Sequence, residues 1–91
     1  MKTLNVKLPI YLAEAMSDSG ELNSRDITYI IGHMKEEEKE EALLEELPSI
    51  TFSYSFKVPR SIHKTIKLLS IEYDIPMNEL TGRLLTYYYR R

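Results

Sequence analysis

Two seven-residue segments of the chain share one pattern, and this repeat limits the fold more than any other feature. Residues 3–9 (TLNVKLP) and 53–59 (SYSFKVP) align without a gap, alternate polar with apolar side chains, and end in lysine, an apolar residue and proline. Alternation with a period of two predicts a strand with one buried face, and proline suits the first turn of a following helix. A lone two-stranded ribbon is not stable in water, so helices are expected to cover the apolar face.

The sequence after each strand predicts two helices. In the second half, Ile62, Ile66, Leu69 and Tyr73 lie on one helical face. Pro76 interrupts that helix, because the residue before a proline disfavours helical torsions. A second helix is predicted from about Met77, with an apolar stripe formed by Leu80, Leu84, Leu85 and Tyr88.

The first half repeats this order with shorter elements. A short helix fits residues 11–17 and ends near Gly20, after which Asn23 or Ser24 can cap a second helix. The second helix carries an apolar stripe of Ile27, Ile30, Ile31 and Met34. It is expected to continue through the acidic residues and to end near Leu47 and Pro48.

Charge divides the chain unevenly. Residues 1–50 carry five basic residues against eleven acidic ones, whereas residues 51–91 carry seven against three. Most of the acidic residues of the first half lie between Glu36 and Glu46. Such a division is typical of a basic working face and a solvated acidic segment. The alternative for the acidic run is that it repels non-specific DNA or binds a partner.

Composition excludes several classes of protein. A chain of 91 residues is marginally stable unless its halves or subunits pack together. It has no cysteine, which excludes disulfides and thiolate metal sites, and no apolar run long enough to cross a membrane. The N-terminus has no stretch typical of a signal peptide, so we expect a cytoplasmic protein.

Two copies of strand, helix and helix, each strand ending in proline, resemble the ribbon–helix–helix family of Arc, MetJ and CopG type. Residues 74–80 (DIPMNEL) look like the turn of that family, with Asp74 and Pro76 where glycine and serine are usual. The resemblance implies a mostly α fold with a short two-stranded antiparallel β-ribbon, as a tandem pseudo-dimer. Its parts are a first unit (1–35), an acidic helical tether (36–50) and a second unit (51–91), with one shared core. The apolar strand residues expected to be buried are Leu4, Val6, Leu8, Phe52, Tyr54, Phe56 and Val58.

The resemblance also implies a function, which is transcriptional regulation by sequence-specific binding of double-stranded DNA. A two-stranded ribbon fits the major groove, where its outward side chains meet base edges. The expected base-reading residues are Thr3, Asn5, Lys7, Ser53, Ser55 and Lys57. Residues at helix N-termini and early in the helix after the second strand are expected to hold phosphates. These are Ser24, Arg25, Arg60, Lys64, Met77 and Asn78. At the start of the helix that carries Met77 and Asn78, Pro76 removes one N–H donor and Glu79 adds an unfavourable negative charge.

A repressor of phage, plasmid or chromosomal origin is the leading hypothesis, and several alternatives stay open. The chain could be an antitoxin, or another interaction module that binds a partner protein such as a toxin through its acidic or C-terminal helix. Its strands could pair within one chain as a monomeric pseudo-dimer, or between chains in a homodimer. Tyr87, Tyr88 and Tyr89 could stack on bases, although a core position for Tyr88 is favoured. His33 and His63 have no ligand partners at metal-binding spacing, and no catalytic motif or cofactor-binding loop occurs, so we expect a protein that is not an enzyme.

Overall fold

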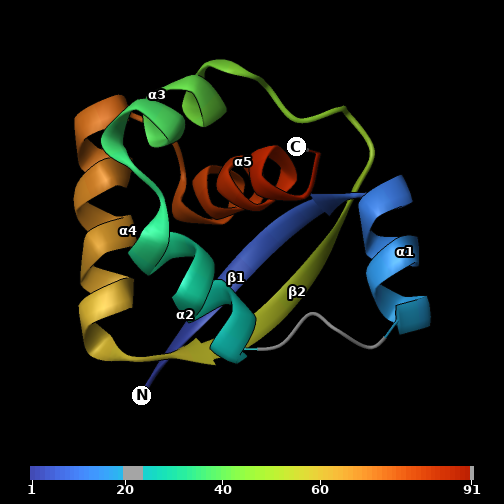
Figure 1. Ribbon diagram of the computed structural model, residues 1–91, viewed down its shortest axis with the longest axis horizontal. Coiled ribbons are helices and arrows are strands. Elements are labelled where there is room, and N and C mark those ends of the chain that lie inside the picture. Colours follow the sequence, from blue (N-terminus) through green and yellow to red (C-terminus); the bar gives the residue numbers. More distant parts are fainter. Residues whose placement is uncertain (20–23, 91) are drawn as a thin grey trace.

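A computed structural model describes residues 1–19 and 24–90 of the chain, with side chains described for 1–14 and 27–89. The fold is mostly helical and contains a two-stranded antiparallel sheet (Figure 1). Its elements are β1 (Lys2–Pro9), α1 (Ile10–Ser19), α2 (Ser24–His33), α3 (Glu36–Leu44), β2 (Thr51–Val58), α4 (Arg60–Tyr73) and α5 (Met77–Arg90). The strand–helix order predicted from the repeat is therefore present in both halves.

The register of the sheet follows the repeat. Asn5 lies directly opposite Ser55, and these two positions are equivalent in the alignment of the two segments. An antiparallel pair can be symmetric about its centre only if equivalent residues face each other there. The neighbouring pairs obey the same symmetry, and they are Thr3 with Lys57 and Lys7 with Ser53. The expected antiparallel ribbon is confirmed, and both of its strands come from one chain.

The helices cover one face of the sheet and bury the apolar row of β1. Leu4, Val6 and Leu8 are fully buried, and they join one core cluster with residues of both halves of the chain. Below the sheet, α5 packs against β1 and α2 packs against β2, while α2 and α5 contact each other. The second helix of each half thus covers the strand of the other half. The two outer helices, α1 and α4, lie at opposite sides of the molecule (Figure 1).

The apolar row of β2 is less buried than predicted. Val58 is fully buried, but Tyr54 and Phe56 are only half-buried, and Phe52 is 50% exposed. The expectation of a continuous buried row in β2 is therefore wrong at Phe52. Phe52 is near the start of β2, at the position equivalent to Lys2 of β1, and both residues are exposed.

The acidic segment is a separate helix and not a continuation of α2, which corrects the prediction of one long helix. Lys35 adopts an extended conformation, and its N–H group donates a hydrogen bond to the Glu38 side chain at 3.1 Å. This break turns α3 back onto α5, where Ala42 and Leu43 become buried. The segment predicted to be a solvated tether therefore also contributes to the core. In the first half, α1 ends at Ser19, in agreement with the predicted end near Gly20.

The turn between α4 and α5 begins at a residue with unusual backbone geometry. Asp74 ends α4 in the left-handed conformation, with a φ of 55° and a ψ of 45°. Glycine adopts this conformation without steric cost, and aspartate tolerates it better than most other residues. The N–H of Ile75 and the hydroxyl of Ser70 then close the turn by donating to the Ser70 and Ile75 carbonyls.

Candidate nucleic-acid interface

The six expected base-reading residues form an outer row on the face of the sheet opposite the helices. All are exposed except Lys7, which is half-buried. Neither strand contains an acidic residue, so the outer row presents only hydroxyl, amide and ammonium groups. We use the name outer row for Thr3, Asn5, Lys7, Ser53, Ser55 and Lys57.

The centre of the outer row is a polar pair that joins the strands. The Ser55 hydroxyl donates a hydrogen bond of 2.8 Å to Oδ1 of Asn5. An amide oxygen has two acceptor positions, and the amide nitrogen has two donors, so Asn5 can still both donate and accept. This combination matches the edge that adenine presents in the major groove.

The outer row has the length of a short DNA site. Thr3 and Lys7 are four residues apart on β1, which corresponds to about 13 Å along an extended strand. Base pairs rise by about 3.4 Å each, so the row covers about four of them. The lysines sit near opposite ends of the row, since Lys7 pairs with Ser53 and Lys57 pairs with Thr3.

A groove at one end of the sheet joins the outer row to the start of α5. It is lined in part by Thr3 and Asn5 of β1, His63 of α4, and Met77 and Asn78 of α5. Four of these five residues were predicted from the sequence, two as base readers and two as phosphate contacts. His63 was given no role, because its helical position does not reveal that it faces the sheet edge.

The first turn of α5 carries less uncompensated negative charge than the sequence suggested. The negative charge of Glu79 is compensated by an ion pair with Arg83, one helical turn further on. Asn78 Oδ1 accepts a hydrogen bond of 2.7 Å from the N–H of Glu79. The N–H groups of Met77 and Asn78 belong to the first turn, where N–H groups have no partner within the helix. Arg83 was missed, although its i,i+4 spacing from Glu79 is a local signal, whereas its contact with Leu43 of α3 depends on the fold.

The remaining predicted phosphate contacts lie at two helix starts. Arg60 and Lys64 are exposed on the first two turns of α4, just after Lys57 in the chain. Ser24 and Arg25 begin α2, but their side chains lie outside the described part of the structure. Of the predicted phosphate contacts, Met77 and Asn78 line the groove beside the outer row.

A close approach between two backbones fixes α5 beneath β1. A Cβ atom on Gly82 would fall 1.9 Å from the carbonyl oxygen of Lys7 and 3.0 Å from a methyl group of Leu47. No side chain fits at that distance, so glycine allows α5 to reach the strand that carries Lys7. Sequence reasoning missed this role, because a glycine within a helix is not distinguished by periodicity.

The C-terminal tyrosines take part in the fold. Tyr87, Tyr88 and Tyr89 are half-buried and pack against the core cluster. The hydroxyl of Tyr87 donates a hydrogen bond of 2.6 Å to Glu41 of α3. The rings of Tyr88 and Tyr89 meet edge to face at 5.3 Å. These contacts favour the interpretation of the tyrosines as packing residues over base stacking.

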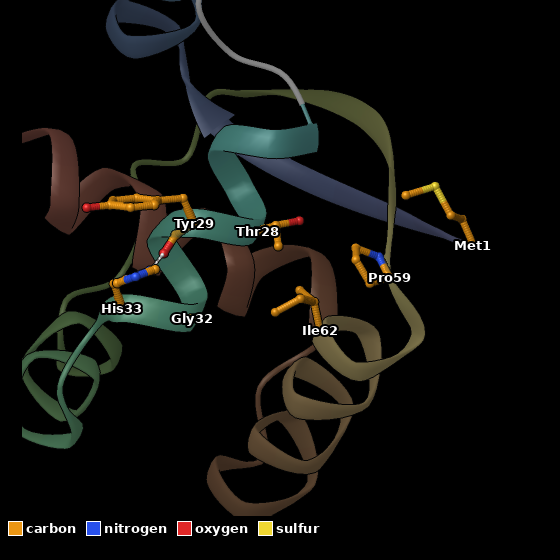
Figure 2. A pocket seen from close by; sticks show the side chains of 7 residues that line it. All are labelled: Met1, Thr28, Tyr29, Gly32, His33, Pro59 and Ile62. Carbon is orange, nitrogen blue, oxygen red and sulfur yellow. Dashed lines mark hydrogen bonds between the residues drawn. The ribbon is translucent and has the colours of Figure 1, made fainter.

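A second hollow is apolar and lies between α2 and the start of α4 (Figure 2). Residues of α2 line one side, and Met1, Pro59 and Ile62 line the other. The rings of Tyr29 and His33 stack at 4.1 Å, and Nδ1 of His33 lies 2.8 Å from the Tyr29 carbonyl oxygen.

The described residues contain neither a metal-binding cluster nor a membrane-spanning helix. Within residues 1–19 and 24–90, no three His, Cys, Asp or Glu side chains are grouped so that they could hold a metal ion. None of the helices in the same part of the chain is long and apolar enough to cross a membrane. The chain matches no family model, and neither a curated protein nor a solved structure is significantly similar to it.

Proposed function

We propose that this protein is a sequence-specific regulator of transcription that reads the major groove of double-stranded DNA with its two-stranded sheet. The observation that carries the proposal is the outer row, an acid-free line of polar side chains on the uncovered face of the sheet. A two-stranded ribbon of this kind fits the major groove, which is about 12 Å wide. In this proposal the chain is a tandem ribbon–helix–helix pseudo-dimer, which the symmetric register and the reciprocal packing of α2 and α5 support.

In the proposed complex, the two lysines and the central pair contact different bases. Lys7 and Lys57 donate to guanine O6 and N7, and Asn5 recognises adenine. The hydroxyl groups of Thr3 and Ser53 can bond to any of several bases, so they discriminate less. Regulation follows from occupancy, because a protein seated in the groove of a promoter blocks the transcription machinery. The role is repression, and no enzymatic step is involved.

The start of α5 and the first turns of α4 fix the orientation on DNA. A phosphate that follows the groove past the end of the sheet meets Asn78 and the first N–H groups of α5. Arg60 and Lys64 extend this contact along the same strand of DNA. Such contacts set the position and contribute affinity that depends on salt, whereas the outer row supplies the specificity.

The first test is a titration of random-sequence duplex DNA at low salt. Replacing both outer-row lysines, Lys7→Ala with Lys57→Ala, is expected to weaken binding by about tenfold or more. The matched control removes two lysines from the region of α3, Lys35→Ala with Lys39→Ala, and is expected to bind like the wild type. An equal loss of affinity in both double variants would show that net charge alone drives binding. It would rule out the sheet as the contact surface.

Binding of a partner protein remains a second candidate because of α3. Glu36, Glu37, Glu40 and Glu41 are exposed on this helix. The C-terminal helix is less suited to the role, since α5 packs against β1, α3 and α4. Co-purification of a basic protein that is lost when Glu37 and Glu40 become glutamine, together with absent DNA binding, would favour this candidate over the first.

A further inference from the structure

The apolar hollow between α2 and the start of α4 is large enough to bind another molecule. Its volume is about 540 Å³, and binding clefts usually have about 300–1,000 Å³. Gly32 of α2 lies in one wall, while Pro59 and Ile62 form part of the facing wall (Figure 2). A Cβ atom added to Gly32 would meet no described atom within 4 Å. The hollow is therefore space that none of the described side chains fills.

The symmetry of the two halves gives this hollow a counterpart between α5 and the start of α1. Asn5 lies opposite its equivalent Ser55, so equivalent strand residues are 50 positions apart. By the same symmetry α2 is equivalent to α5, and α4 is equivalent to α1. Each of the two inner helices also carries one glycine, and these glycines, Gly32 and Gly82, are again 50 positions apart.

In the counterpart, the chain's own residues 45–48 (EELP) occupy the space. They line a cavity of only about 60 Å³ together with residues of α5 and with Tyr11 of α1. A methyl group of Leu47 lies 3.0 Å from the position that a Cβ atom on Gly82 would take. Gly82 is buried, whereas Gly32 is exposed. A short non-helical segment with leucine followed by proline is thus the kind of chain that fits between these helices.

Charge favours the same kind of segment at the open hollow. No acidic side chain is among the described residues that line it. Lys2 and Arg60 each follow a lining residue in the chain, and both are exposed. In the counterpart, Arg83 lines the same cavity as Glu45 and Glu46. Acidic residues before the leucine are therefore attracted to the edge of the hollow.

From these observations we infer that the apolar hollow binds a short segment of a partner protein in which acidic residues precede a leucine and a proline. The leucine side chain covers Gly32, and the acidic residues face Lys2 and Arg60. Proline has a fixed φ, so the segment loses less conformational entropy when it is ordered. Because only a few side chains are buried, the contact is weak and reversible.

The first test uses a synthetic peptide with the sequence of residues 44–50 (LEELPSI) and uncharged ends. It is titrated into the isotope-labelled full chain and followed by nuclear magnetic resonance. We expect saturable binding with a dissociation constant below about 1 mM, with shifts of the amide signals of Gly32 and Ile62. The peptide that carries Leu47→Ser with Pro48→Ser should bind at least about tenfold more weakly. Shifts confined to α5 would mean that the peptide replaces residues 45–48 of the chain itself, and would overturn the inference.

The second test fills the hollow from within. Gly32→Leu should weaken peptide binding by about tenfold or more, and the variant should stay folded because leucine favours helix and the position is unobstructed. The matched control is Ser53→Leu, which adds a leucine without a change of charge at the exposed residue opposite Lys7, and should leave binding unchanged.

Three results would overturn the inference. They are no saturable binding of the wild type up to about 1 mM peptide, equal weakening by both leucine variants, and the same amide shifts on concentrating the chain without peptide. The last result would place a second copy of the chain in the hollow. Since DNA is absent from these measurements, none of these results bears on the proposed reading of DNA.

Discussion

Gly82 shows how one residue sets the position of the candidate reading face. Its α-carbon lies so close to β1 that an added methyl group would overlap the Lys7 carbonyl. The strand that carries half of the outer row is thus seated directly on α5. Any side chain at this position must push the helix and the strand apart.

Gly82→Ala is therefore expected to destabilise the protein by about 1–3 kcal/mol or more, as overpacking does in other cores. Gly32→Ala is the matched control, because it also lies in a helix but its added Cβ meets nothing within 4 Å. That control is expected to stabilise by about 0.5–1 kcal/mol, since alanine favours helix. Urea unfolding followed by circular dichroism measures both, and equal shifts would contradict the close approach.

Asp74 supports a second prediction at the scale of one residue. Its positive φ of 55° costs free energy for any residue with a side chain. Asp74→Gly should relieve this cost and stabilise the protein by about 0.5–1 kcal/mol, whereas Asp74→Val should destabilise it. Thermal unfolding of the two variants is the measurement, and a loss of stability in the glycine variant would show that the aspartate side chain matters more than the backbone conformation.

Among the elements, the strands were easier to predict than the helix boundaries. Alternation and the terminal prolines are local signals, so segments 3–8 and 53–58 were identified as the strands of one sheet. The break before α3 depends on a hydrogen bond from Lys35 to Glu38 and on the burial of Leu43 against α5. The hydrogen bond is a weak local signal. The burial of Leu43 is a tertiary contact, which no sequence pattern predicts.

The candidate site was likewise predictable from the sequence only in part. The outer row follows from strand periodicity alone, which is why all six residues share one face. The groove at the sheet edge depends on where α4 and α5 dock, so His63 could not be assigned to it from the sequence. The incomplete cover of Phe52 was missed because alternation gives the face of a strand, and not how far along the strand the helices cover it.

Arg83 is expected to hold α3 on the body of the molecule. Its Nη1 donates a hydrogen bond of 2.6 Å to the Leu43 carbonyl, while Nη2 pairs with Glu79. Arg83→Met should cost about 1–3 kcal/mol, because the half-buried partners lose their hydrogen bonds. Amide hydrogen exchange should then rise mainly in α3. Glu79→Gln keeps the bond to Leu43 and should leave α3 protected, so equal exchange in the two variants would contradict this role.

For the whole molecule, pairing of both strands within one chain predicts that folding does not need a second copy. The sheet and the core cluster join the two halves, so unfolding should be a single transition. We expect its midpoint to stay constant as the protein is diluted, because no subunit has to dissociate. A midpoint that falls steadily on dilution, down to concentrations at which the free protein is monomeric, would mean that strands exchange between chains.

Symmetry of the outer row predicts the form of the DNA site. Lys7 is equivalent to Lys57, and Thr3 is equivalent to the similar Ser53, but Asn5 and Ser55 differ at the centre. The site should therefore have two similar halves around an asymmetric middle. Asn5→Ser makes the central pair identical and should shift the preferred site towards a full palindrome.

The most direct measurement of the central claim is selection of binding sites from random double-stranded DNA, with the wild type and the Lys57→Ala and Asn5→Ala variants side by side. The account predicts that the wild type enriches a short site of two similar halves, and that each variant loses preference at the position its residue reads, by about 1–3 kcal/mol per base contact. Enrichment of no sequence, or of the same sequence with all three proteins, would contradict the claim that the outer row reads DNA.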